Sequence, residues 1–408
     1  MSTVTSPMTI SARLSEISVH EGWRKSALEQ LVHSGLPGSK HEEYRFTPIL
    51  KTLEKHAAEL EFNPNPADAQ GHASSLPVPA CTVIIRNGHP EIPSELPAGI
   101  SMHVERDWTE QKSDDSYALL NQILAPARLV IGCTSADGAT LHIHHISGGA
   151  KAIAVSPVVH VKIEDSCKLT LVDSHSSANS AFVFLNASLE VHVGTGSEFT
   201  LVSLQNNTGA HTHIQHTTIR QKAGSTVHSF VLTSEGSVIR NNTSFILEGS
   251  GAEANLNGLY LLGGKTLADN HTVVDHRVPD ANSNELYKGV MAGNSRGVFN
   301  GKIFVRQDAQ RTNAFQSNRN ILLSEDAGVH TKPQLEIWAD DVKCSHGCTT
   351  GQLDEEALFY LLSRGIDKQE AQAMLLEAFA SDAINLIRDE QLRHWVRELA
   401  LEKINRLK

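Results

Sequence analysis

The run FVFLNASLEVHV at residues 182–193, followed by a Gly-Thr-Gly turn and then SEFTLVSL at residues 197–204, typifies the centre of this 408-residue chain. Both runs alternate apolar residues with polar or β-branched ones, which is the pattern of two β-strands joined by a turn. Similar runs recur from about residue 138 to 345, with almost nothing between them long enough to form a helix. This region is therefore predicted to be all-β. The pattern excludes βαβ folds, whose parallel strands need helix-length crossovers.

The turns of this region repeat. Similar segments begin at Gly196, Gly224 and Gly251, at intervals of 28 and 27 residues, and related turns start at Asp165 and Asp326. A drifting period between 20 and 50 residues indicates a solenoid. In an all-β segment the corresponding fold is a β-helix, whose coils stack about 4.8 Å apart. A β-sandwich with coincidentally similar turns is the alternative.

Both ends of the chain differ from its centre in composition and in the spacing of apolar residues. Residues 8–60 show helical spacing of apolar residues, and residues 62–80 are rich in Pro, Asn, Ala and Ser, as in an exposed linker. After Asp354 the sequence is helical again, and Asp367 with Glu370 forms a pattern like a capping box. We expect these last helices to cap one end of the solenoid. The predicted organisation is an N-terminal helical region (1–61), a linker and mixed α/β segment (62–137), a β-helix core (138–350) and a C-terminal helical domain (351–408).

Composition narrows the class of protein. Lys and Arg number 35 against 46 Asp and Glu, giving a formal charge of −11, and the basic residues are scattered. Nucleic-acid binding, which needs a basic stripe, is not expected. The sequence has no apolar run of the roughly 20 residues that span a bilayer, and no secretory signal is visible. Five cysteines, an odd number, fit a reducing compartment, so we expect a cytoplasmic protein.

Gly263-Gly264-Lys265-Thr266 resembles the end of a phosphate-binding loop. The motif requires a glycine where this chain has Leu259, and a helix after the threonine, whereas strand and turn residues follow. We therefore do not expect the chain to hydrolyse ATP by itself.

Two enzyme classes remain as alternatives. The 22 histidines could serve a His-rich metalloenzyme, although no H-x-H pair has a carboxylate at a spacing that demands a metal, so surface or turn positions are favoured. A β-helix is also an architecture of polysaccharide lyases and hydrolases, which need convergent charged groups. The histidines concerned are His142, His144, His145, His160, His211, His213, His216, His271 and His276; the charged candidates are Asp269, Asp275, Asp280, Lys288 and Arg296.

Cys344-Ser345-His346-Gly347-Cys348 is the sharpest local motif. In an extended strand all three ligand-type side chains point to one face, because the side-chain period is two. Cys344 and His346 are close enough to share an ion or cluster, whereas Cys344 and Cys348 would be roughly 13 Å apart. Lys343 and His346 could lower the pKa of the Cys344 thiol. The alternative is that Cys344 and Cys348 are simply small buried residues and that His346 is an ordinary histidine without a ligand role.

Around this motif the sequence resembles a known family. DVKCSHG at 341–347 and GQLDEEALFYLLSRGI at 351–366 closely resemble the C-terminal signature of the SufB/SufD family of the SUF iron–sulfur cluster assembly system. GLP at 35–37 and KHEEYRFTP at 40–48 look like the start of its SufD branch rather than its SufB branch. The resemblance covers both ends of the chain.

The resemblance implies a right-handed parallel β-helix flanked by helical domains, acting as a scaffold without catalysis of its own. It implies a heterodimer with SufB and places Cys344 and His346 at that interface, where transient iron–sulfur clusters are built. Cys348 stands where the family usually has a small residue, so it is either an additional ligand or an apolar substitute.

The resemblance also implies that the C-terminal helices dock the ABC-type ATPase SufC, here around Glu356, Phe359, Tyr360 and Arg364. The family complex is associated with a reduced flavin, for which the sequence offers no residues. In isolation, two copies of the chain could form a homodimer through the surface meant for SufB.

Overall fold

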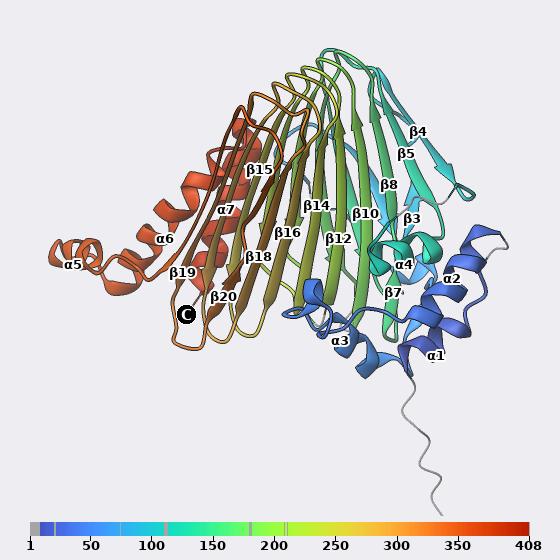
Figure 1. Ribbon diagram of the computed structural model, residues 1–408. Coiled ribbons are helices and arrows are strands. Elements are labelled where there is room, and N and C mark those ends of the chain that lie inside the picture. The colour runs from blue at the N-terminus through green and yellow to red at the C-terminus, as the bar shows by residue number, and fades with distance from the viewer. Residues whose placement is uncertain are drawn as a thin grey trace, which may run out of the picture.

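The computed structural model describes residues 9–19, 22–73, 75–109, 113–178, 182–207, 209 and 211–407. Two long sheets form the opposite walls of a solenoid of about seven turns, with helices at the outside (Figure 1). Within the described residues, no helix has the length and apolar character needed to cross a membrane.

Each sheet is assembled from alternate strands of the sequence, so every coil contributes one strand to each wall. The first sheet, called sheet A here, contains β20 (Gly328–Thr331), β18 (Arg296–Val305), β16 (Leu267–His276), β14 (Val238–Leu247), β12 (His211–Gln221), β10 (Val183–Val193), β8 (Val158–Ile163), β5 (Arg128–Cys133) and β4 (Ile100–Glu105), with β1 (Glu61–Phe62), β7 (Ile153–Val155) and β21 (Gln334–Ile337) beside this path. The second, sheet B, contains β22 (Val342–Gly351), β19 (Thr312–Leu322), β17 (Asn282–Met291), β15 (Glu253–Leu262), β13 (Thr226–Thr233), β11 (Glu198–Gln205), β9 (Lys168–Ser177), β6 (Ala139–Ser147), β2 (Cys81–Arg86) and β3 (His89–Glu91).

The strand pairing confirms the predicted solenoid. Glu198 pairs with Thr226, and Thr226 pairs with Glu253, in parallel register at the 28- and 27-residue intervals that the turns indicated. The β-sandwich alternative is wrong, because a sandwich is built from antiparallel sheets. Within the described residues, only β2 with β3 and β4 with β5 pair antiparallel. Strands β1, β2 and β5 all pair in parallel with strands of the core, so the ladders extend into the 62–137 segment.

One corner of the coil explains the repeating turns. Gly196, Gly224 and Gly251 all have a left-handed backbone, with φ of 65°, 63° and 74°. The amide of Gly196 donates to the carbonyl of Ala223 at 2.9 Å, and that of Gly224 to Ser250 at 2.9 Å, so each turn is bonded to the next coil. Glycine suits this corner because it adopts positive φ without a steric penalty.

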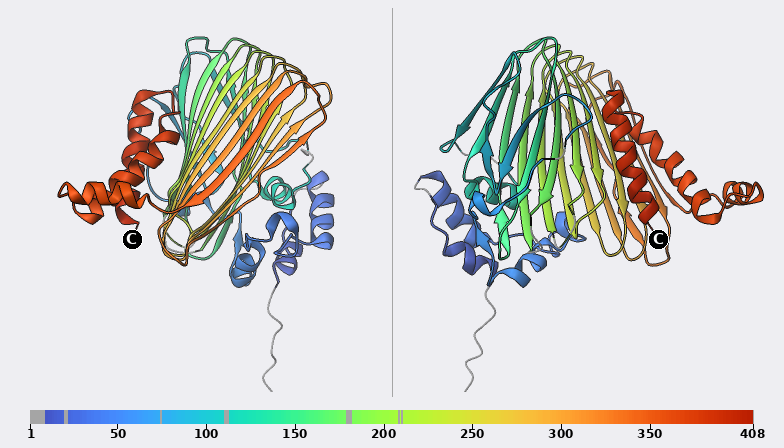
Figure 2. Two further views of the ribbon diagram at one scale, coloured as in Figure 1. Left: turned by 60° about the vertical axis from the view of Figure 1, so that its left-hand side comes forward. Right: turned by 180° about the vertical axis from the view of Figure 1, so that it is seen from behind.

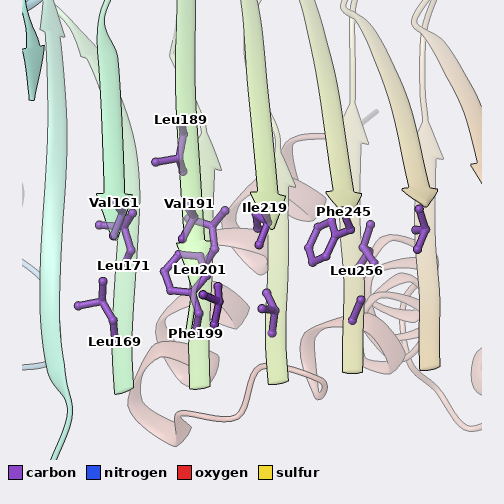
Figure 3. Close-up of a cluster of buried hydrophobic side chains, with 14 of the residues drawn as sticks. Val161, Leu169, Leu171, Leu189, Val191, Phe199, Leu201, Ile219, Phe245 and Leu256 are labelled. Carbon is purple, nitrogen blue, oxygen red and sulfur yellow. The ribbon is translucent and has the colours of Figure 1, made fainter. Parts of the chain in front are cut away.

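The solenoid interior is filled by alternate side chains of both sheets. Val161, Val191 and Ile219 of sheet A face Leu171 and Leu201 of sheet B in one continuous apolar core (Figure 3). Removing this aliphatic surface from water is the dominant favourable term in folding. The interior also contains buried polar side chains, including Asp173, Gln205, Asn241 and Asn270.

The N-terminal helices cover the outer face of sheet A (Figure 2). They are α1 (Ile10–Ser15), α2 (Trp23–Ser34), α3 (Ile49–His56) and α4 (Ser116–Leu124), with short 3-10 turns at Glu42–Tyr44 and Pro66–Asp68. Their buried apolar residues form one cluster with Phe184, Ile214 and Val238 of the sheet. Gly35, with φ of 75°, ends α2 as its C-cap.

The C-terminal helices are α5 (Glu355–Ser363), α6 (Lys368–Ile384) and α7 (Glu390–Arg406). Asp354 and Asp367 are N-caps whose carboxylates accept backbone amides, as their sequence positions predicted. The expectation that these helices cap an end of the solenoid is wrong. Helices α6 and α7 lie on the outer face of sheet B, where Leu376 and Val396 pack with Leu259 (Figure 2). The end of the solenoid formed by β22 is therefore left open to solvent.

Candidate functional site

The 344–348 motif lies in β22, the last strand of sheet B. The strand is extended, and Cys344, His346 and Cys348 pair with Ala314, Gln316 and Asn318 of β19. Alternation places the three side chains on the side of the sheet that faces the solenoid interior, and Cys344 packs against the edge of the apolar core. His346 and Cys348 are exposed, since no further coil covers them.

The extended geometry decides which residues can share an ion. Successive same-side residues are about 6.6 Å apart along a strand, and residues four apart are about 13 Å apart. Metal–sulfur bonds are near 2.3 Å, so one ion can contact Cys344 and His346 but cannot bridge Cys344 and Cys348. Cys344 and His346 together offer two ligands, which is fewer than the four of a tetrahedral ion.

The expected lowering of the thiol pKa by Lys343 and His346 is wrong. Burial raises the pKa of Cys344 above its ordinary value, and a backbone hydrogen bond at Ala314 only partly opposes this effect. The thiol is therefore protonated in the isolated chain at neutral pH. A protonated thiol can act as a metal ligand only after the metal displaces its proton.

A buried carboxyl group lies two strands away from His346, at the same register position of sheet B. Glu285 on β17 pairs with Gln316, which pairs with His346. Burial raises the pKa of Glu285 to about 7, while Gln316 Nε2 donates a hydrogen bond to its Oε2 at 2.6 Å. Sequence analysis missed this residue. A Glu at an inward-facing position of an alternating strand is the only sequence signal that could have found it.

A groove of about 1080 Å³ runs beside the motif, between the outer face of sheet B and the α6–α7 connection. Its lining includes Ser345, His346 and Gly347 of β22 as well as Arg388 and Arg393. Anionic species can approach β22 along this groove, because both arginines are cations.

The expected docking residues lie together on α5 and its C-cap. Phe359 is 72% exposed and Tyr360 56% exposed, and the Arg364 guanidinium lies 5.1 Å from the Tyr360 ring centre. Glu356 is also exposed, in the first turn. Helix α5 projects away from the body of the protein (Figure 1). Large exposed aromatic side chains on one helix are typical of an interaction surface.

The structure of residues 263–266 does not form a phosphate-binding loop. Gly263–Thr266 forms the turn between β15 and β16, so a strand follows it. This segment has no helix N-terminus to direct at a phosphate.

The five charged residues considered for a lyase do not converge. Asp269 pairs with Arg240 on the outer face of sheet A, under the N-terminal helices, whereas Lys288 pairs with Asp382 on the outer face of sheet B. The other three have different partners. Asp275 pairs with Arg277 and Arg306. Asp280 pairs with Arg311, and Arg296 donates a hydrogen bond to the Asp326 carbonyl. This set cannot act on one substrate.

The preference for surface or turn positions of the histidines is wrong. Seven of the nine considered are buried, and only His160 and His271 are half-buried. His142 and His144 contact the Ser174 hydroxyl, each at 2.7 Å. The sequence could not reveal this burial, because a strand shows which residues share a face but not what covers that face.

These histidines predict an acid-sensitive fold. Burial lowers the pKa of His142 and His276 to about 4 and that of His144 to about 3. Between about pH 6.5 and 4 the unfolded chain binds protons that the folded chain does not, so the free energy of unfolding should fall as the pH falls. Glu285, with its raised pKa, acts in the opposite direction, but it is one group against three. Urea denaturation midpoints measured between pH 7 and 4.5 check this, and a flat profile would contradict it.

Comparison with known proteins gives the same family as the motif. The family model described as "SUF system FeS cluster assembly, SufBD core domain" matches residues 145–379. The chain is 31% identical over 389 residues to the iron–sulfur cluster assembly protein SufD of Escherichia coli (strain K12), covering 90% of this chain and 89% of that protein. It is 28% identical over 407 residues to Protein ABCI7, chloroplastic, of Arabidopsis thaliana, covering 92% of this chain and 84% of that protein. The chain therefore belongs to the SufB/SufD family of SUF-system iron–sulfur cluster assembly proteins.

Proposed function

We propose that this chain is a non-catalytic, cytoplasmic scaffold subunit of a SufBCD complex. In this proposal β22 meets SufB, and Cys344 and His346 supply part of the site where a cluster is assembled. The supporting observation is that the ten-residue strand β22 carries both side chains at the open end of the solenoid. It pairs with β19 along one edge and, within the described residues, with no strand along the other. An exposed edge strand is a ready template for pairing with another chain.

The ligand chemistry suits iron and sulfide as the cargo. Thiolate and imidazole groups both bind iron–sulfur species. His346 offers an exposed imidazole, and Cys344 offers a thiol held against the core, so the pair combines an accessible ligand with a fixed one. The partner would complete the coordination. A reduced flavin, which the family resemblance associates with the complex, has no assigned residue in this chain and no role in these steps.

Replacing His346 tests the proposal. In a complex reconstituted with SufB and SufC, His346→Ala should lower the yield of assembled cluster by about tenfold, because an accessible ligand is lost. Cluster absorbance and iron content per complex are the measurements. Thr349→Ala, at an exposed position on the opposite side of β22, is the matched control. Unchanged yield and iron content in His346→Ala would remove the role proposed for this side chain.

The Cys348→Ala variant then distinguishes the two interpretations of that residue. An additional ligand would lower the cluster yield when removed, whereas an apolar substitute would leave it unchanged. We favour the second outcome, because Cys348 is too far along the strand to share an ion with Cys344.

We further propose that α5 docks SufC, with Phe359 and Tyr360 as anchors beside Glu356 and Arg364. Aromatic anchors at interface centres typically contribute 2 kcal/mol or more, so Phe359→Ala should weaken SufC binding about 30-fold. Met374→Ala on α6, which removes another exposed apolar side chain, is the matched control. Titration calorimetry with purified SufC measures both. Wild-type affinity in a Phe359→Ala, Tyr360→Ala double variant would exclude this surface.

The connection between the two surfaces is short. Strand β22 ends at Gly351 and α5 begins at Glu355, with only three residues between them. ATP-driven dimerisation of SufC would therefore pull directly on the strand that carries Cys344 and His346. This is a two-state switch, and it requires that the ATPase dimer binds the opened interface more tightly than the closed one. In the absence of SufB, the same free edge would accept a second copy of this chain, and sedimentation analysis of the isolated protein tests for that homodimer.

A further inference from the structure

Three ligand-type side chains meet inside the solenoid, far from β22. His145 on β6 and Asp173 and His175 on β9 face the interior, and one ligand atom from each lies within 4.8 Å of the others. His145 Nε2 is 3.0 Å from Asp173 Oδ1, and His175 Nε2 is 3.5 Å from Asp173 Oδ2. Six strand positions of sheet B separate β9 from β22, which corresponds to about 29 Å. This cluster is therefore separate from the 344–348 motif.

The three side chains are buried and poorly satisfied. Their side-chain exposures are 7% for His145, 6% for Asp173 and 1% for His175. Asp173 Oδ1 and both ring nitrogens of His175 have no hydrogen-bond partner of good geometry, although Asp173 Oδ1 lies 3.0 Å from His145 Nε2. Unsatisfied buried polar atoms cost about 1–3 kcal/mol each, so a cluster of them calls for a missing partner.

The ligand types of the cluster suit a cation. Two imidazoles lie beside one carboxylate, with nitrogen–oxygen distances of 3.0 and 3.5 Å. Neutral imidazole and ionised carboxylate are the forms that bind metals. His213 packs against His175, with ring centres 4.5 Å apart, and limits the movement of that ring.

A small void adjoins the cluster. It has a volume of about 10 Å³ and is lined by His145, Asp173 and Gln215, together with apolar side chains such as Val159 and Leu189. A space of this size holds about one water molecule. Three protein ligands and one water would complete a four-coordinate site.

We propose that His145, Asp173 and His175 bind one divalent transition-metal ion inside the solenoid, with a water in the adjoining void as the fourth ligand. Two imidazoles and one carboxylate form a ligand set for Zn²⁺ or Fe²⁺. Because the site is enclosed, the ion enters as the chain folds and is then held between β6 and β9. The proposal does not depend on the function proposed for β22.

A second cluster of two histidines and one carboxylate gives a matched control. His160, Glu190 and His192 also lie within ligand distance of one another, but His192 is 42% exposed and hydrogen-bonds to Glu190 at 3.0 Å. Glu190 also pairs with Arg220. This outer cluster is already satisfied by its protein partners and is not expected to retain a metal.

The experiment uses the full chain without a histidine tag, unfolded in chelator and refolded with Zn²⁺ or, anaerobically, with Fe²⁺. After desalting, the wild type should retain about one ion per chain, and Asp173→Asn should retain at least about tenfold less. His192→Gln should retain as much as the wild type. Refolding with Co²⁺ should give visible bands of nitrogen and oxygen coordination without the near-ultraviolet band of a thiolate, which separates this site from Cys344.

Two results would overturn the proposal. One is a wild-type chain that keeps almost no Zn²⁺, Fe²⁺ or Co²⁺ after refolding. The other is metal that survives in Asp173→Asn and is lost in His192→Gln or shows thiolate coordination. If Asp173→Asn does not fold, the anomalous scattering of a Co²⁺-loaded wild-type crystal decides the question, since its position either falls between His145 and His175 or does not.

Discussion

Gly249→Ala should destabilise the protein by about 3 kcal/mol or more and sharply reduce its soluble yield. Gly249 follows β14, at the corner where successive coils stack. A Cβ added there would lie 1.9 Å from the Ala223 amide nitrogen and 2.3 Å from the Lys222 carbonyl carbon. These are backbone atoms of the preceding coil. The Lys222 amide donates to the Val193 carbonyl and the Ala223 carbonyl accepts from the Gly196 amide, so this backbone cannot move aside as a side chain could.

Gly224→Ala is the matched control for this prediction. It lies at the same corner with φ of 63°, and nothing lies within 4 Å of its added Cβ. Its cost should be limited to the left-handed backbone penalty of about 1–2 kcal/mol. Urea denaturation of both variants measures the difference. Equal midpoints would show that backbone overlap between coils does not limit the fold.

Arg240→Met should cost about 3–5 kcal/mol and release the N-terminal helical region from sheet A. Arg240 on β14 is 2% exposed and its Nη1 lies 2.6 Å from Asp269 Oδ2. The same nitrogen donates to the Glu43 carbonyl at 2.7 Å, and the guanidinium lies 4.1 Å from the centre of the Tyr44 ring. Methionine fills similar space but leaves the Asp269 carboxylate buried without its cation.

The measurements are the urea midpoint and the rate of proteolysis within residues 9–60. Arg277→Met is the control. Arg277 pairs with two carboxylates, those of Glu248 and Asp275, but is 45% exposed, where ion pairs contribute about 0–1 kcal/mol. Proteolysis at the wild-type rate in Arg240→Met would mean that the apolar cluster alone holds these helices. That outcome would mean that the contacts of Arg240 with Asp269, Glu43 and Tyr44 do not anchor the N-terminal helical region.

The repeat was predictable from sequence because it depends on local requirements. Gly196, Gly224 and Gly251 mark a corner that needs a left-handed residue in every coil, and the strands between them alternate. However, the corresponding corners of the flanking coils are Ser166, Asp280 and Arg311, at φ of 58°, 63° and 57°. Hydrogen bonds between neighbouring turns allow these residues to keep a left-handed backbone. The corner is therefore glycine in the central coils and another residue in the coils on either side.

The motif strand was also predictable, and its surroundings were not. Alternation placed Cys344, His346 and Cys348 on one face, and β22 has that geometry. The raised pKa of the Cys344 thiol depends on its contact with the core, which the neighbouring residues in sequence do not report. Helices α6 and α7 lie on a sheet face and not over the open end. They do so because their apolar residues pack against apolar residues on the outer face of sheet B.

The sequence by itself determined the coil period, the strand alternation, the helix caps and the family, because each depends on residues close together in the chain or on a contiguous motif. Only the tertiary structure decided which edge stays open, and that His145 meets Asp173 and His175, since these depend on the register between coils and on what covers each sheet. Side chains about 30 residues apart become neighbours only when the coils stack, and no local pattern encodes that meeting.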